Sequence, residues 1–322
     1  DINKAIYFYQ LAADMNDTKA QYMLGMIYFQ NKNYQDIEKA IYYFSLSAHQ
    51  GNQFSQTNLG LIYSNAKNKC FDIQKAIKYY NLAIKQKEPT ALNNLGCLYY
   101  NGDFVKRDVS KGIELLTQSA KLNNPDAFFN LGVIYYQGIY IKNDINKAIN
   151  YFYAAAEHNN LFALSNIGLI YYEGKYIKQD IKKAIHYLLA AQKNNPYALN
   201  NLGCIFSDGY IPIDANKAIN FFESAAHKNL PQAQVNLANI YYRGKIVSFN
   251  IKKAIKYYEI AASQNDADSI FNLAMIYYEG KYVERDIEKT IENLKELSSF
   301  ENQYAKNNLG VIYKNGDGVK KD

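Results

Sequence analysis

The sequence predicts an all-α fold, a right-handed α-solenoid (superhelix) of antiparallel helix-turn-helix repeats of about 36 residues. The first observation is a phrase that recurs nine times: Asp-Ile-x-Lys-Ala-Ile-x-Tyr-Tyr-x-x-Ala-Ala, a loop, then Ala-x-x-Asn-Leu-Gly-x-Ile-Tyr-Tyr-x-Gly. The second is that apolar residues inside each copy recur at three- and four-residue spacing, as on one helix face. The copies begin at residues 1, 36, 72, 108, 144, 180, 214, 250 and 286, so we expect a single repeat array over residues 1–322. Because residue 1 already lies inside a copy, we also expect the chain to be part of a longer protein.

The first predicted helix of each copy, which we call the B helix, begins after an aspartate in eight copies and after Asn250 in the other. In the copy 144–179 it covers residues 145–156, and Asp144 is a good N-cap because its carboxylate can accept from the free amides of the first turn. Lys147 occupies the third helical position, so this is a simple cap and not a capping box. The apolar positions of this helix share one face: Ile145, Ala148, Ile149, Phe152 and Ala155.

The second predicted helix, the A helix, covers residues 161–173 in the same copy. Gly174 follows it, and a glycine at this point suits a left-handed C-cap. Four other copies place proline in the first turn of this helix, where a missing amide is tolerated: Pro89, Pro125, Pro196 and Pro231. Small residues such as Gly168 let the two helices approach closely, so a bulky side chain there should overpack the interface and cost roughly 1–3 kcal/mol.

Composition and motifs exclude several classes of function. The net charge of +6, with lysines and acidic residues intermixed, indicates a solvated surface. No apolar run approaches about 18 residues, so we expect no transmembrane segment. The three cysteines form no disulfide framework, and Cys97 and Cys204 are expected to pack as small apolar residues. Without a visible leader, the compartment stays unknown, with the cytoplasm favoured.

No catalytic or metal-ligand pattern is present in the sequence. The four histidines are isolated from one another and from any repeated Cys, Asp or Glu set: His49, His158, His186 and His227. Serines and carboxylates are scattered singly, so no nucleophile with its base can be assigned. We therefore expect no enzyme activity, no cofactor, no metal and no small-molecule substrate.

The pattern Ala-x-x-x-Leu-Gly-x-x-Tyr-x-x-Gly followed by Asp-x-x-Lys-Ala-x-x-Tyr-Tyr-x-x-Ala-Ala resembles the Sel1-like repeat (SLR) family, a branch of the tetratricopeptide-type (TPR-like) α-solenoids. The resemblance covers the whole chain. The family's Gly-x-Gly-Val connection survives only at residues 316–319, and the second glycine is elsewhere usually Tyr, Phe or Ile. The first aromatic position of the B helix, Tyr or Phe in most copies, is occupied by Leu115 and Asn293 in two copies. We expect these departures to alter loop shape and local packing more than the fold.

Two sets of residues on one face of the A helices form the predicted partner-binding site, because the resemblance implies that this face lines a concave groove. An asparagine precedes Leu-Gly, or its variants Ile-Gly and Leu-Ala, in eight copies, and a ladder of side-chain amides could bind the backbone of an extended peptide. The ladder residues assigned to the site are Asn94, Asn130, Asn166, Asn201, Asn236 and Asn272. Tyrosines on the same strip and two aromatic neighbours of the ladder complete it: Tyr100, Tyr136, Tyr172, Tyr242, Tyr278, Phe129 and Phe271.

Two interpretations of the ladder stay open. In one the amides contact a ligand, and in the other they bridge adjacent A helices and hold the superhelix together. The sixth copy is two residues shorter around Pro212 and carries Ser207 in place of the tyrosine, which predicts a local bend or a boundary of the groove.

The predicted function is a non-enzymatic scaffold or adaptor that binds protein partners, with a peptide segment in the groove. Family resemblance implies assembly of membrane-associated, degradation or signalling complexes, so a regulatory subunit of such a complex is one alternative. RNA binding by helical repeats is the other. Nucleic acid is disfavoured because the A helices lack a repeated Lys/Arg stripe for phosphates.

Overall fold

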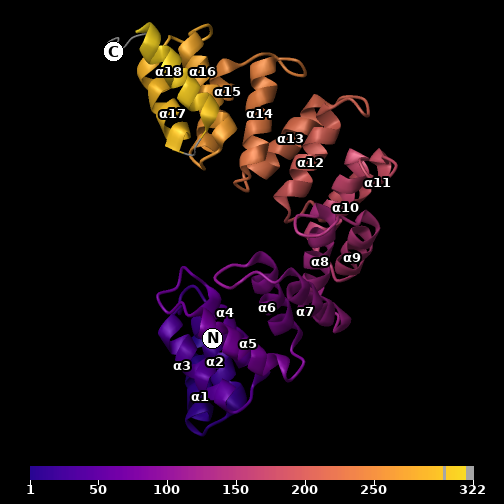
Figure 1. Ribbon diagram of the computed structural model, residues 1–322, viewed down its shortest axis with the longest axis vertical. Helices are drawn as coiled ribbons and strands as arrows, with labels where there is room; N and C mark the ends of the chain where they lie inside the picture. The colour runs from indigo at the N-terminus through magenta and orange to yellow at the C-terminus, as the bar shows by residue number, and fades with distance from the viewer. Residues whose placement is uncertain (300–301, 317–322) are drawn as a thin grey trace. The chain divides into compact units, whose positions relative to one another are not determined.

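The computed structural model describes residues 1–299 and 302–316, and this part of the chain consists of α-helices and short connections (Figure 1). Its eighteen helices alternate between B helices, which open the copies, and A helices, which close them. The B helices are α1 (Ile2–Asp14), α3 (Ile37–His49), α5 (Ile73–Ile84), α7 (Val109–Lys121), α9 (Ile145–Glu157), α11 (Ile181–Ala191), α13 (Ala215–Ala226), α15 (Ile251–Ala262) and α17 (Ile287–Ser299). The A helices are α2 (Thr18–Gln30), α4 (Gln53–Ser64), α6 (Pro89–Asn101), α8 (Pro125–Gln137), α10 (Leu161–Glu173), α12 (Pro196–Ser207), α14 (Pro231–Arg243), α16 (Ala267–Glu279) and α18 (Gln303–Asn315).

The repeating unit is a hairpin of one A helix and the B helix that follows it. These pairs, such as α6 with α7 and α12 with α13, pack more extensively than a B helix does with the next A helix. The chain therefore contains eight such hairpins in its described part, with α1 before the first and α18 after the last. This confirms the predicted all-α solenoid-like fold of paired helices.

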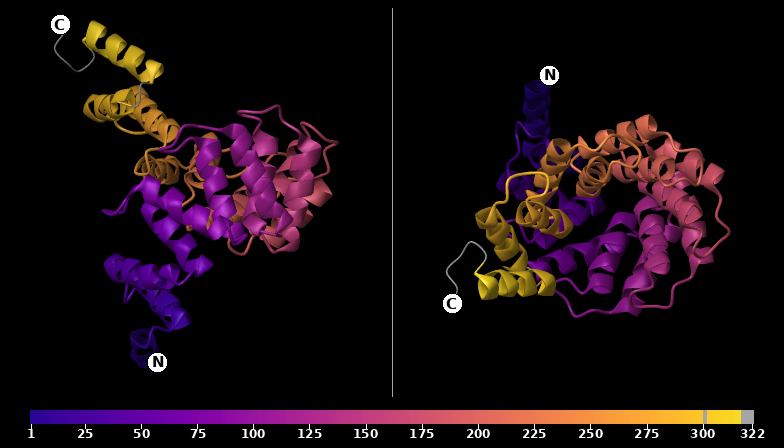
Figure 2. Two further views of the ribbon diagram at one scale, coloured as in Figure 1. Left: turned by 60° about the horizontal axis from the view of Figure 1, so that its bottom comes forward. Right: turned by 90° about the horizontal axis from the view of Figure 1, so that it is seen from above.

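Residues 1–163 and 164–322 form two compact units, and the division falls inside α10. Within each unit, helices that follow one another along the chain lie side by side (Figures 1 and 2). Each unit repeats the same hairpin packing. The single array over the whole chain stays a prediction.

Close approach of the paired helices depends on small residues opposite large ones. Phe152 is fully buried, and a Cβ added to Gly132 would lie 2.6 Å from its ring. A Cβ added to Gly168 would lie 2.6 Å from Cγ of Leu188, which agrees with the overpacking expected at that position. The interior is packed to crystal-like density, so such a contact forces a neighbour to move.

The predicted caps and turns are present. Asp144 Oδ1 accepts from the backbone N–H of Lys147 at 3.0 Å, and Gly174 has a φ of +59° at the end of α10. The first copies turn differently, because the C-caps Asn31 and Asn65 are in extended conformations. The connection that begins at Gly316 continues over residues 317–319, which lie outside the described residues.

The recurring lysine of the B helix joins the cap to the preceding A helix. Lys147 Nζ lies 3.7 Å from Asp144 Oδ2 and 5.1 Å from the ring centre of Tyr135. The same lysine stands over an A-helix aromatic in other copies: Lys39 over Tyr28, Lys75 over Tyr63, Lys111 over Tyr99, Lys183 over Tyr171, Lys217 over Phe206, Lys253 over Tyr241 and Lys289 over Tyr277. Each contact stabilises the hairpin by about 0.5–1 kcal/mol at an exposed site, so this lysine has a structural role.

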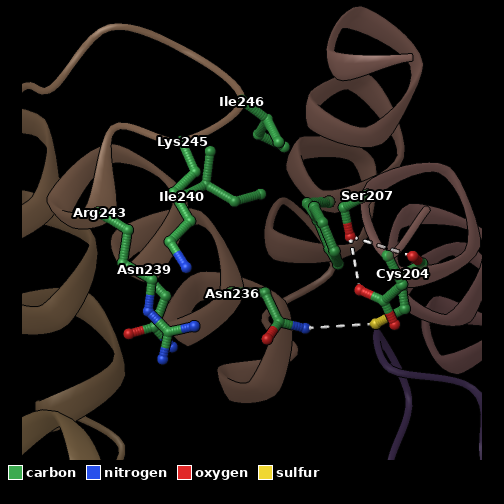
Figure 3. A pocket seen from close by; sticks show the side chains of 10 residues that line it. Cys204, Ser207, Asn236, Asn239, Ile240, Arg243, Lys245 and Ile246 are labelled. Atoms are coloured by element: carbon green, nitrogen blue, oxygen red, sulfur yellow. Dashed lines mark hydrogen bonds between the residues drawn. The ribbon is translucent and has the colours of Figure 1, made fainter. Parts of the chain in front are cut away.

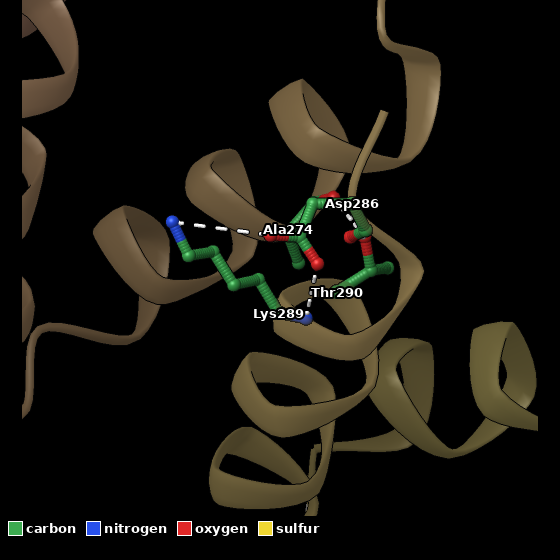
Figure 4. A network of polar contacts seen from close by, with 4 residues as sticks. All are labelled: Ala274, Asp286, Lys289 and Thr290. Atoms are coloured by element: carbon green, nitrogen blue, oxygen red, sulfur yellow. Dashed lines mark hydrogen bonds and ion pairs between the residues drawn. The ribbon is translucent and has the colours of Figure 1, made fainter. Parts of the chain in front are cut away.

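Figure 4 shows how the last complete hairpin accommodates a polar residue in its tight interface. Thr290 stands where the other copies have alanine or glycine, and it is 1% exposed. Its Oγ1 donates to the carbonyl of Asp286 at 2.7 Å and lies 3.4 Å from the carbonyl of Ala274. The buried hydroxyl is therefore paired, which avoids the penalty of an unsatisfied polar group.

Candidate peptide-binding face

Each asparagine assigned to the ladder is a half-buried side chain of its A helix. All six assigned asparagines are neither fully buried nor fully exposed, and each lies one residue before a buried Leu or Ile of its helix. A half-buried amide keeps part of its surface in water, so it can still meet a ligand. What distinguishes the six is the partner that each amide already has.

Two asparagines of the ladder bridge neighbouring A helices. Asn130 of α8 donates through Nδ2 to Asn93 Oδ1 of α6 at 2.9 Å, and Asn236 of α14 donates to Asn200 Oδ1 of α12 at 2.9 Å. The acceptor in both cases is the residue before the ladder position of the preceding copy. In both bridges, the variable residue of the preceding copy is itself an asparagine.

Two other asparagines keep their hydrogen-bonding capacity. Within the described residues, the side chains of Asn201 on α12 and Asn272 on α16 make no hydrogen bond. Asn94 accepts from the Nδ2 of Asn93 at 3.2 Å, within its own helix. Each interpretation of the ladder is therefore supported by some of its residues. Asn130 and Asn236 bridge adjacent A helices, whereas Asn201 and Asn272 have amides that could still bind a ligand.

The tyrosine strip packs between successive copies. Tyr100 is only 7% exposed and lies against Tyr140 of the next connecting loop, with ring centres 5.4 Å apart. Tyr172 is half-buried, packs on Tyr210 at 5.8 Å and donates its hydroxyl to Asp208. Burial and this hydrogen bond raise the pKa of Tyr172 above its ordinary value. The tyrosine strip therefore mainly packs one copy against the next. Tyr100 exposes almost no surface that a partner could contact.

Of the remaining tyrosines, Tyr242 follows the same pattern, whereas Tyr278 contacts the connection that follows its own helix. Tyr242 packs on Tyr282 with ring centres 6.3 Å apart, and Arg285 stacks over Tyr278 at 5.2 Å. Tyr136 is half-buried like them. The loop aromatics that contact the strip, such as Tyr140 and Tyr282, stand at the second-glycine position of the family's connection, which explains why this chain tolerates large residues there.

Phe129 and Phe271 are half-buried on the same face. Phe129 lies 6.0 Å from the buried Phe152 ring and 6.2 Å from Phe162, which is 48% exposed. Phe162 belongs to a set that the sequence analysis did not assign to the site, the exposed aromatics four residues before a ladder asparagine. The set is Phe54, Phe162, Tyr197 and Tyr304. Four-residue spacing on a helix was the signal that could have found them.

Two features of the described residues concern reactivity: the cysteines of the A helices and the placement of possible metal ligands. Burial raises the pKa of the Cys97 thiol to about 11 and, with the Asp208 carboxylate, that of Cys204 to about 12, which keeps both thiols protonated. No group of three or more His, Cys, Asp or Glu side chains in residues 1–299 and 302–316 is placed to hold a metal ion. No helix in the same ranges has the length and apolar character needed to cross a bilayer.

Comparison with known proteins agrees with the repeat pattern. The family model described as Sel1 repeat matches ten consecutive segments: residues 1–17, 18–52, 53–88, 89–124, 125–160, 161–194, 196–230, 231–266, 267–298 and 303–322. A search of curated proteins found no match.

Among solved structures, the chain is similar to a Sel1 repeat protein from Oxalobacter formigenes, with 26% identity, a TM-score of 0.70, and coverage of 95% of this chain and 90% of that one. It is also similar to a protective antigen from uropathogenic Escherichia coli strains displaying an SLR fold, at 25% identity, with a TM-score of 0.49 and coverage of 98% and 76%. Yeast Tom70 shares the helical fold at 16% identity, with a TM-score of 0.52 and coverage of 93% and 64%. Because the family model matches nearly every residue, the chain belongs to the Sel1 repeat family.

Proposed function

We propose that this chain is a non-enzymatic scaffold that binds a protein partner through an extended peptide segment lying along the A helices. Sel1 repeat proteins are typically non-catalytic and generally serve as protein-interaction scaffolds. The observation that carries the proposal is the pair Asn201 and Asn272, whose amides have no hydrogen-bond partner within the described residues. Each amide can both donate to and accept from a peptide backbone.

Exposed aromatic side chains also favour the A-helix face as the peptide-binding site. Tyr197, on the first turn of α12, is 55% exposed and lies four residues before Asn201, hence on the same side of the helix. Tyrosine adds apolar contact area with a polar end, which is why it is enriched in interfaces. The amide of Asn201 beside the exposed ring of Tyr197 can bind both the backbone and a side chain of an extended peptide.

Charge on this face disfavours the RNA alternative. The last position of the A helices carries an exposed acidic residue in three copies, at Glu173, Asp208 and Glu279. Arg243 is the one cation at this position among the nine copies, so no repeated basic stripe is present there. Proteins that bind nucleic acid non-specifically derive most of their affinity from repeated Lys and Arg contacts to phosphates. We therefore favour a protein ligand.

Two double variants separate ligand contact from structural bridging. Asn201→Ala with Asn272→Ala removes amides without a partner, so binding should weaken while the guanidinium unfolding midpoint stays unchanged. Asn130→Ala with Asn236→Ala removes two bridges and leaves their acceptors unpaired, so this variant should lose stability, by roughly 0.5–1.5 kcal/mol per bridge.

The binding readout is photo-cross-linking in lysate of the source cell, with p-benzoylphenylalanine at Tyr197. The matched control carries the same cross-linker at Leu189, which is 41% exposed on the B helix α11. Protein adducts at position 197 that are absent at 189, resist nuclease and decrease in the Asn201/Asn272 variant would support the proposal. Equal adducts at both positions, or adducts that nuclease removes, would contradict it.

A further inference from the structure

The joint between α12 and α14 departs from the repeat at four positions. Ser207 replaces the tyrosine found in most A helices, and Arg243 occupies the position after the tyrosine, where the other copies have Asn, Gln, Asp or Glu. Asn239 replaces an apolar or cysteine residue, and Ile246 stands where four other loops carry Phe or Tyr. These four residues come together in space, since all of them line one pocket.

The pocket has a volume of about 220 Å³, and Figure 3 shows the side chains that line it. Its lining comes from the end of α12, from α13, from α14 and from the loop after it: Cys204, Ser207, Asp208, Phe222, Asn236, Asn239, Ile240, Arg243, Lys245 and Ile246. Pockets for drug-sized ligands occupy roughly 300–1,000 Å³. This one is smaller and matches a single large side chain.

The neighbouring copy shows what fills this space elsewhere. One repeat earlier, Tyr172 packs on Tyr210 and donates its hydroxyl to Asp208 of the following A helix. Ser207 is the counterpart of Tyr172, and Arg243 is the counterpart of Asp208. The pocket therefore corresponds to the space that a tyrosine side chain fills in the preceding copy. It stays open after α12 because the side chain of Ser207 is too small to fill it.

The polar groups around the pocket differ in how far they are already engaged. Asp208 accepts from Tyr172 and from Ser207 Oγ, the latter at 3.2 Å, and Asn239 Oδ1 accepts from the Tyr258 hydroxyl at 2.7 Å. Arg243 and Lys245 make no hydrogen bond or ion pair within the described residues. Two unengaged cations beside one engaged carboxylate favour an electron-rich or anionic group at the mouth.

We propose that this pocket receives a tyrosine side chain of the bound peptide, within an acidic stretch of that peptide. The ring lies against Ile240 and Ile246, and the phenolic oxygen accepts from the Arg243 guanidinium, while Lys245 faces a neighbouring carboxylate of the peptide. The partner thus supplies the aromatic residue that most other copies carry themselves. This inference rests on the proposed function and adds the chemistry of one anchor residue.

The test uses the capped peptide Glu-Glu-Tyr-Glu-Glu, its Tyr-to-Ala version and the wild-type chain labelled at isoleucine δ1 methyl groups. Methyl NMR detects weak binding, so titration to about 5 mM covers millimolar dissociation constants. We expect the Ile240 and Ile246 methyl signals to shift with the tyrosine peptide, and the alanine peptide to bind at least about tenfold more weakly. Absence of shifts at both methyl groups, or equal shifts with the alanine peptide, would overturn the proposal.

Two variants and one control complete the design. Ser207→Tyr should fill the pocket from within and remove the shifts, whereas Ser64→Tyr adds the same bulk at the equivalent position of α4 and should leave them unchanged. If Ser207→Tyr fails to fold, Arg243→Glu on the exposed end of α14 should fold and weaken the tyrosine peptide at least about tenfold.

The outcome also separates this inference from the proposed function. If cross-linking at position 197 persists while Ser207→Tyr leaves peptide and partner binding unchanged, the peptide-binding face stands and the tyrosine pocket is wrong. If cross-linking at 197 fails but the tyrosine peptide still shifts Ile240 and Ile246, the pocket stands without the proposed groove.

Discussion

Alanine in place of Gly112 is expected to lower the free energy of unfolding of the α6–α7 hairpin by about 1 kcal/mol. Seven other copies carry alanine at this position and Thr290 takes the eighth, so sequence comparison among the repeats would predict that the change is harmless or stabilising. The opposite expectation comes from the distance between these two helices.

A Cβ on Gly112 would lie 2.7 Å from the backbone N of Tyr100 and 2.9 Å from the carbonyl oxygen of Gly96. These are backbone atoms of α6, so no side-chain rotation can relieve the contact and the two helices must separate. Overpacking of a well-packed interface typically costs about 1–3 kcal/mol. The gain in helix propensity from glycine to alanine is about 1 kcal/mol, which leaves a net loss of about 1 kcal/mol at the middle of the range.

Native-state hydrogen exchange is the suitable assay, because a repeat array opens locally and a single global midpoint would average the effect. Amides of α6 and α7 should lose protection while those of α15 change little. Gly310→Ala on α18 is the matched control. Among the described residues, no atom beyond the neighbouring backbone of α18 lies within 4 Å of the added Cβ, so this variant should gain up to about 1 kcal/mol. Unchanged or increased protection of α6 and α7 in Gly112→Ala would refute the reasoning from backbone distance.

Three further predictions concern caps, thiols and tyrosines. Asp144→Ala should destabilise α9 by about 0.5–2 kcal/mol, measured by hydrogen exchange, because the first-turn amide of Lys147 loses its acceptor; no change would mean that solvent caps the helix equally well. In the native chain at pH 8, iodoacetamide should modify Cys70 ahead of Cys97 and Cys204, whose raised pKa values leave little thiolate, and mass spectrometry of the labelled sites would show the order. Burial raises the pKa of Tyr258 to about 12, so its contribution to stability is full below the unfolded pKa near 10 and is lost as pH rises through about 12. Tyr258→Phe should therefore flatten the fall in urea midpoint between about pH 10 and 12, and an unchanged slope would assign the fall to other tyrosines.

Much of the fold could be predicted from residue spacing because each repeat encodes its own helices. Asp144 and Gly174 define local helix ends whose backbone geometry depends on a few adjacent residues, and both act as expected. The pairing of large with small residues, as in Phe152 against Gly132, is likewise visible in the alternation of the repeat. The role of Lys147 was not predicted, because its aromatic partner Tyr135 lies on the preceding helix.

The site was less predictable, because its properties depend on pairs of residues about one repeat apart. Asn130 and Asn201 occupy the same position of the phrase, yet Asn130 bridges to Asn93 while Asn201 makes no side-chain hydrogen bond within the described residues. Tyr100 resembles the other tyrosines of its strip in sequence but is covered by the next copy's loop.

By itself, then, the sequence determined the repeat, the helices, their caps and the face that the A helices share, because these follow from hydrogen bonding and periodicity within one repeat. Only the tertiary structure decided which amides remain unpaired, which tyrosines are covered and that the loss of one ring at Ser207 opens a pocket beside Arg243. The physical reason is that burial and hydrogen-bond saturation are properties of two neighbouring repeats together, and a small difference in either repeat changes both.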